Sequence, residues 1–230
     1  MRAQTDINEK MRAILIDWLV DVHLKFKLLP DTMHLTVNII DRFLSLKHVV
    51  RKKLQLVGVT AMLLASKYEE IYAPEVKDFV YISDKAYTRD EILKMESLML
   101  GTLRWHLTVP SAHTFNKRCI KCADLPGDNT FANLATYAVE LTMPEYSMIK
   151  YLPSMIAASA NYLALEILGR GSWNATLQSY TTYSESALRN CVTDMRAILL
   201  KQQGTPQLQA VKKKYSSVKF SEVALIPMTR

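Results

Sequence analysis

The stretch LQLVGVTAMLLASKYEEIY, residues 54–72, is apolar for most of its length and then abruptly charged. Its first thirteen residues contain no charged side chain, and Lys67, Glu69 and Glu70 follow in quick succession. A helix without a polar face belongs in a protein interior, surrounded by other helices. The stretch therefore predicts a central helix whose last turn reaches the protein surface.

The rest of the chain has the apolar periodicity of helices. Apolar residues recur at i, i+3, i+4 and i+7 almost throughout, glycine is scarce at six residues, and no segment alternates convincingly like a strand. The fold class is therefore predicted to be all-α, with Thr88 and Ser184 as helix N-caps. The expected helices are 8–28, 32–46, 52–71, 75–82 and 88–106, then 112–123, 130–143, 152–168, 175–181 and 185–203.

The two sets of five helices are similar to each other. Residues 59–67 align with 152–160 at an offset of 93, and 91–103 align with 187–199 at an offset of 96. We expect a duplicated five-helix bundle, in which the third helix of each copy is central. Chance similarity between apolar helices is one alternative, and a single long bundle is another. The expected domains are residues 1–108 and 109–230.

This alignment provides an internal comparison for the charges. Lys67 falls opposite Ala160 and Glu96 opposite Val192, so the second copy is expected to carry neither charge. Because burial of an unpaired charge is costly, we expect Lys67 and Glu96 to lie near each other at the exposed end of the central helix. They form either an ordinary internal salt bridge or part of a binding surface, and the asymmetry between the copies favours the surface.

The first expected helix has two apolar stripes where a surface helix needs one. The interpretation favoured by the residues alone is that this helix is covered on both sides. The stripes are Ala13, Ile16, Leu19 and Val20, and Met11, Ile14, Leu15, Trp18 and Val22.

Charge and composition exclude few functions. The formal charge of +7 permits binding to nucleic acid or to an acidic partner, but the basic residues are spread along the chain. The densest run, Lys212–Lys214, is expected to be a solvated helix end. No apolar run reaches the ~20 residues of a membrane span, so a folded, soluble, intracellular protein is expected.

The residues that carry catalysis or bind metals give no coherent site. Three cysteines are too few for a disulfide framework, and Cys119 and Cys122 form only half of a zinc spacing, so packing is their expected role. No Ser/His/Asp or Cys/His arrangement stands out. We therefore expect no catalytic residue, no metal and no cofactor.

Several linked motifs resemble a known family. MRAILIDWLVDV (11–22), HLTVNIIDRFLS (34–45), LQLVGVTAMLLASKYEEIYAPE (54–75) and YTRDEILKMESLMLGTLRWHL (87–107) closely resemble the cyclin box of the cell-cycle cyclins, in order and properly spaced. The segments TDINEK, ELTM, SYTTYSESAL and VKKKYSSVKF look most like B-type, mitotic cyclins. The resemblance covers essentially the whole chain.

The resemblance implies tandem cyclin-box bundles without catalytic activity that bind and activate a cyclin-dependent kinase in a one-to-one complex. By the family motifs, Lys67 and Glu96 clamp the kinase C-helix and Glu70 holds a basic residue near the activation loop. Tyr68 and Trp105 stand where many relatives have Phe. The implied kinase-binding residues are Leu64, Lys67, Tyr68, Glu69, Glu70, Ile71, Glu96, Leu100 and Trp105.

The resemblance also implies a second docking surface, for substrates or inhibitors with an Arg-x-Leu motif. Asp21 would meet the basic residue of the motif. The implied patch is Met11, Ile14, Leu15, Trp18, Asp21, Arg51, Leu54 and Gln55. The implied role is control of mitotic entry at G2/M, in nucleus and cytoplasm, without nucleic-acid or membrane binding. A cyclin-fold transcription factor that binds DNA is the alternative; it requires Lys and Arg gathered on one surface, and the sequence shows no such clustering.

Overall fold

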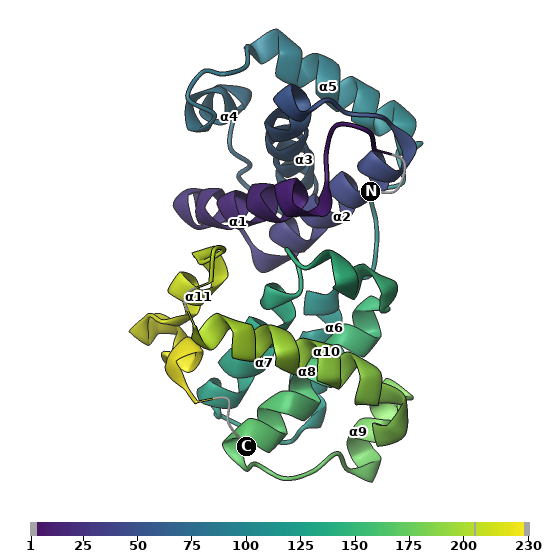
Figure 1. Ribbon diagram of the computed structural model, residues 1–230, viewed down its shortest axis with the longest axis vertical. Helices are drawn as coiled ribbons and strands as arrows, with labels where there is room; N and C mark the ends of the chain where they lie inside the picture. Colours follow the sequence, from purple (N-terminus) through teal and green to yellow (C-terminus); the bar gives the residue numbers. More distant parts are fainter. Residues whose placement is uncertain (1–3, 205, 228–230) are drawn as a thin grey trace. The chain divides into compact units, whose positions relative to one another are not determined.

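The computed structural model describes residues 4–204 and 206–227, and within these ranges it contains helices and no strand (Figure 1). Two compact units follow each other along the chain, Met1–Val109 and Pro110–Arg230. All ten predicted helices are present. The predicted all-α fold is confirmed.

The first unit is built around its third helix, as predicted. Helix α3 packs against α1, α2, α4 and α5 (Figure 1), and every residue from Leu56 to Ser66 is buried. Neighbouring helices therefore cover the apolar surface of α3 on all sides. The helices are α1 (Glu9–Phe26), α2 (Pro30–Leu46), the 3-10 turn η1 (Arg51–Lys53), α3 (Leu54–Glu69), α4 (Val76–Ile82) and α5 (Arg89–Thr102).

Gly58 lets α1 cross α3 at close range. A Cβ placed on Gly58 would lie 2.7 Å from Leu15 Cδ1, inside the contact distance of two carbon atoms. Because glycine has no side chain, the two helices can approach each other closely at this point. The close approach also fixes Leu15, which belongs to the second apolar stripe of α1, against the core.

A buried ion pair joins α1 to α2. Arg12 Nε and Nη2 donate to the two carboxylate oxygens of Asp41 at 2.6 and 2.7 Å, and the Arg12 side chain is 1% exposed. A bidentate contact of this kind fixes the orientation of the guanidinium relative to the carboxylate, because the two hydrogen bonds are parallel. The pattern of apolar residues gave no sign of this pair.

Helix α5 is shorter than predicted. The expected helix 88–106 ends at Thr102, because Arg104 and Trp105 adopt left-handed conformations with φ of 52° and 61°. The Trp105 N–H then donates to the Leu100 carbonyl at 3.0 Å, which closes the helix end. Thr88 caps the other end, as predicted.

The second unit repeats the plan with one addition. Helix α8 packs against α6, α7 and α10, while α9 packs against α6. Ser184 caps α10, as predicted. Helix α11 was not predicted. The elements are α6 (Ala112–Cys122), α7 (Asn129–Leu141), η2 (Tyr146–Lys150), α8 (Pro153–Leu168), α9 (Ala175–Thr181), α10 (Glu185–Gln203), α11 (Ala210–Tyr215), η3 (Val218–Phe220) and η4 (Val223–Leu225).

The basic run Lys212–Lys214 is not simply a solvated helix end, and that prediction was wrong for Lys214. The Lys214 side chain is 5% exposed, and its Nζ lies 2.7 Å from both carboxylate oxygens of Glu140 on α7. The Tyr215 hydroxyl donates to the same carboxylate at 2.8 Å, and burial raises the pKa of Tyr215 well above its usual value. The cluster holds α11 against α7.

The three cysteines differ in exposure. Cys119 and Cys191 are buried, Cys122 is half-buried, and all three are free thiols. Burial raises the pKa of Cys119 and of Cys191 to about 11. In the described parts of the chain, no three His, Cys, Asp or Glu side chains meet as metal ligands, and no helix is long and apolar enough to cross a membrane.

We predict that N-ethylmaleimide alkylates Cys122 at least about tenfold faster than Cys119 or Cys191 at pH ~8, since buried thiols with a raised pKa supply little thiolate. Mass spectrometry of peptides from the natively labelled protein measures the three rates. In urea the rates should converge. Equal rates in the native protein would contradict the packing of Cys119 and Cys191.

Candidate protein-binding surfaces of the first unit

The last turn of α3 and the middle of α5 meet through opposite charges. Lys67 Nζ lies 2.8 and 3.0 Å from the two carboxylate oxygens of Glu96. The side chains are 48% and 14% exposed, so the pair lies at the surface, and the predicted proximity is confirmed. An ion pair this exposed contributes about 0–1 kcal/mol to stability. The fold therefore depends little on these two charges.

The predicted absence of a charge opposite Lys67 in the second unit was wrong, whereas α5 and α10 begin at Arg89 and Glu185, an offset of 96 that keeps Glu96 opposite the uncharged Val192 as predicted. Helices α3 and α8 both have 16 residues and begin at Leu54 and Pro153, an offset of 99. Lys67 then falls opposite Glu166, not Ala160. The offset of 93 was not reliable, because two helices that are apolar on all sides match at several registers.

Glu166 takes part in an ion pair of its own. Its Oε2 lies 2.6 Å from Arg196 Nη2 on α10. The two units thus place opposite charges between their third and fifth helices, but with reversed polarity. In the first unit the third helix carries the positive charge, Lys67, and in the second unit the third helix carries the negative charge, Glu166.

Apolar side chains that are wholly or partly exposed lie close in sequence to Lys67 and to Glu96. Ile71 is 89% exposed, Trp105 72% and Tyr68 47%. Leu100 lies one turn beyond Glu96 on α5 and is half-buried, and the Tyr68 hydroxyl is hydrogen-bonded to the Thr108 hydroxyl. Large apolar groups exposed together are typical of protein-binding surfaces. We call Lys67, Tyr68, Ile71, Glu96, Leu100 and Trp105 the α3–α5 surface.

Three of the predicted kinase-binding residues are less available to a partner than the exposed residues of the α3–α5 surface. Leu64 is 4% exposed and belongs to the core, which leaves it little area for a partner. Glu69 is half-buried. Glu70 is engaged within the unit: its Oε1 accepts the Leu29 N–H at 2.7 Å and the Thr32 hydroxyl.

Glu70 thereby caps α2. Leu29 is the N-cap residue of that helix and has no side chain able to accept a hydrogen bond, and Pro30 is its first residue. The carboxylate from the end of α3 accepts the N–H of the N-cap residue itself, as the glutamate of a capping box does, and places a negative charge at the helix N-terminus. The sequence signal was the Leu29-Pro30 pair, because proline is favoured at the first position of a helix as well as after one.

A groove runs between α1 and the start of α3. Its volume is about 290 Å³. The lining residues are Met11, Ile14, Leu15, Trp18, Arg51, Leu54 and Gln55. The predicted patch residues therefore line one depression, except Asp21, which is exposed on α1 outside the lining.

The interpretation that α1 is covered on both sides holds only in part, although Leu15 and Val22 of the second stripe are buried. Ile16, Leu19 and Val20 of the first stripe are buried, but in the second stripe Ile14 is 52% exposed and Trp18 is half-buried. An apolar stripe that remains open to solvent can bind a partner.

Asp6 holds Arg51 at the edge of this groove. Its carboxylate accepts the Arg51 backbone N–H and the guanidinium Nε, each at 2.8 Å. The same two bonds hold the pKa of Asp6 below its usual value, the backbone bond having the larger effect. The sequence gave no reason to place Asp6 here.

The chain matches two family profiles over almost its whole length. Residues 1–108 match the one described as the N-terminal domain of cyclins, and residues 110–229 match the C-terminal domain of cyclins. The chain belongs to the cyclin family.

Related cyclins confirm the predicted likeness to B-types. This cyclin is 49% identical to Cyclin-B2-2 of Arabidopsis thaliana over 225 residues, which are 97% of this chain and 52% of that protein. It is 48% identical to G2/mitotic-specific cyclin-2 of Medicago sativa over 225 residues, 97% of this chain and 68% of that protein. An A-type relative, Cyclin-A2-1 of Oryza sativa subsp. japonica, is 47% identical over 226 residues, 96% of this chain and 46% of that protein. The chain spans about half the length of the first and third relatives.

Solved structures share the fold at low identity. The X-ray structure of a viral cyclin from herpesvirus saimiri has a TM-score of 0.77 and 22% identity, covering 86% of this chain and 87% of that chain. A chain of the CAK complex from Chaetomium thermophilum has a TM-score of 0.59 and 16% identity, covering 96% of this chain and 70% of that chain. The predicted tandem cyclin-box fold is confirmed.

We predict that Glu70→Ala lowers the free energy of unfolding of this cyclin by about 1 kcal/mol, because α2 loses its only side-chain cap among the described residues. Lys67→Ala serves as the control and should change it by less than about 1 kcal/mol. Urea unfolding followed by circular dichroism measures both. Equal stability of Glu70→Ala and the unmodified chain would contradict the capping role.

Proposed function

We propose that this cyclin is a non-catalytic regulatory subunit that binds a cyclin-dependent kinase one-to-one and activates it. The observation that carries the proposal is the α3–α5 surface, where an exposed ion pair lies among exposed apolar side chains on a member of the cyclin family. Charged groups at such a surface set the orientation of a partner, and apolar groups supply most of the binding free energy.

The α3–α5 surface has the apolar side chains that tight binding requires. Ile71 and Trp105 are largely exposed within their own unit. Burial of a large apolar side chain contributes about 1.5–3 kcal/mol. Lys67 and Glu96 belong to the same surface and offer one donor group and one acceptor group to the kinase helix.

Activation follows from selection of one kinase conformation. A protein kinase is active when a glutamate of its C-helix pairs with the strand lysine that holds the ATP phosphates. A ligand that turns a 1:99 equilibrium into 99:1 must prefer the active state by about 5.5 kcal/mol. Two or three apolar side chains, buried only when the C-helix is swung in, supply a difference of this size. The packing of α3 on all sides keeps their geometry fixed.

We further propose that the groove beside Trp18 captures substrates or inhibitors with an Arg-x-Leu motif. Its apolar lining suits the leucine, and Asp21 on α1 is exposed and available to the arginine. The likeness to a G2/mitotic-specific relative supports a role in mitotic entry at G2/M. We also propose a location in nucleus and cytoplasm. Binding to nucleic acid or membranes is not part of the proposal.

A charge exchange tests the α3–α5 surface. The double variant Lys67→Glu/Glu96→Lys keeps the internal ion pair but reverses its polarity toward a partner. We predict that it loses stimulation of an inactive, monomeric cyclin-dependent kinase by at least about tenfold, equivalent to 1.4 kcal/mol. Phosphorylation of a histone peptide measures the stimulation.

The matched control exchanges the corresponding pair of the second unit, Glu166→Arg/Arg196→Glu, and should stimulate the kinase like the unmodified chain. Thermal unfolding verifies that both double variants are folded. Full stimulation by the Lys67/Glu96 exchange would contradict the proposal, as would loss of stimulation in the control alone.

For the groove, we predict that Trp18→Ala weakens binding of an Arg-x-Leu peptide at least about tenfold, because the side chain at the centre of the lining is removed. Fluorescence anisotropy measures the affinity, with an Arg-x-Ala peptide as ligand control. Ile14→Ser, at a more exposed position, should weaken binding in the same direction without loss of folding. Unchanged affinity in both variants would rule out the groove.

A further inference from the structure

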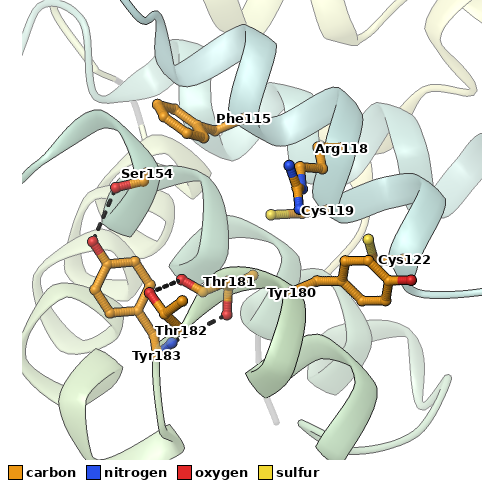
Figure 2. A pocket seen from close by; sticks show the side chains of 9 residues that line it. All are labelled: Phe115, Arg118, Cys119, Cys122, Ser154, Tyr180, Thr181, Thr182 and Tyr183. Atoms are coloured by element: carbon orange, nitrogen blue, oxygen red, sulfur yellow. Dashed lines mark hydrogen bonds between the residues drawn. The ribbon is translucent and has the colours of Figure 1, made fainter.

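The second unit contains a pocket whose residues take no part in either proposed surface. Its volume is about 260 Å³, enough for a whole side chain rather than a single water. Figure 2 shows the side chains of α6 on one side and those at the end of α9 facing them. The lining residues are Phe115, Arg118, Cys119, Cys122, Ser154, Tyr180, Thr181, Thr182 and Tyr183.

Arg118 is the only charged residue of this lining. Its guanidinium lies 5.7 Å from the centre of the Tyr180 ring, and in the described part of the chain no carboxylate pairs with it. Stacking on an aromatic ring holds a guanidinium in place while its N–H groups remain available. The lining contains no Asp or Glu, and α6 itself carries Lys117, Arg118 and Lys121 without any acidic residue.

The hydroxyl groups of the pocket add one further donor. Thr181 and Thr182 already donate to backbone carbonyls, at 2.7 and 2.6 Å. The Ser154 and Tyr183 hydroxyls lie 2.9 Å apart, so one donates to the other and the second keeps a proton for a ligand. The Phe115 ring and the sulfur of Cys119 supply apolar surface beside these donors.

We propose that this pocket binds an acidic peptide segment of a protein partner, with an Asp or Glu carboxylate on Arg118 and a neighbouring apolar side chain against Phe115. A planar guanidinium matches a planar carboxylate through two parallel hydrogen bonds. One cation in the lining balances one negative charge, whereas a phosphate group with nearly two charges would require a second cation. The proposal stands independently of kinase binding.

Cys122 provides a direct measure of occupancy, because it lines the pocket and is the least buried cysteine. The probes are the blocked peptides Ac-Leu-Glu-Phe-NH₂ and its neutral counterpart Ac-Leu-Gln-Phe-NH₂. A peptide at about ten times its Kd leaves roughly one-tenth of the sites open, so alkylation of Cys122 in the full chain should slow about tenfold. We expect the Glu peptide to bind about tenfold more tightly than the Gln peptide.

Arg118→Gln should remove the preference for the Glu peptide over the Gln peptide. Arg189→Gln changes an exposed arginine of α10 and should leave that preference intact. Each alkylation rate is compared with and without peptide in the same variant, so that any effect of Arg118 on thiol reactivity cancels. Absence of protection, equal protection by both peptides, or a preference that survives Arg118→Gln would overturn the proposal. Stronger protection by Ac-Leu-phosphoserine-Phe-NH₂ than by the Glu peptide would overturn the carboxylate assignment in favour of phosphate.

Discussion

Helix α3 is apolar on every side from Leu56 to Ser66, and the arrangement of the first unit follows from the need to cover it. Four helices pack around it, and Gly58 allows one of them to approach closely. Charged groups are then restricted to the end of α3, where the chain reaches the surface. The position of Lys67 and of the Glu70 cap is a consequence of this constraint.

The same constraint applies to α8, but the two units differ where their central helices meet the fifth helix. Lys67 pairs with Glu96 in the first unit, and Glu166 pairs with Arg196 in the second. A partner helix that presents charges complementary to one arrangement meets like charges in the other, which is an effective means of discrimination. The duplicated fold can thus present one copy of the proposed kinase-binding surface rather than two.

The sequence predicted the elements well because their signals are local. Apolar periodicity located all ten helices, and Thr88 and Ser184 were recognised as caps. Prediction from the sequence failed where contacts between distant residues determine the structure. The burial of Lys214 depends on Glu140, and the N-terminus of α2 is bound by Glu70. The register between α3 and α8 was missed because apolar helices match at several offsets. The groove was found only through the family resemblance, since periodicity cannot tell a covered stripe from an open one.

Hydrogen–deuterium exchange of this cyclin, alone and with a monomeric cyclin-dependent kinase, tests the central claim most directly. Partner contact slows the exchange of amides that open locally in the free protein. The account predicts slower exchange in residues 67–72 and 96–105, with residues 166–171 and 192–201 of the second unit unchanged. Slower exchange confined to the second unit, or none in a mixture that forms a complex, would contradict it.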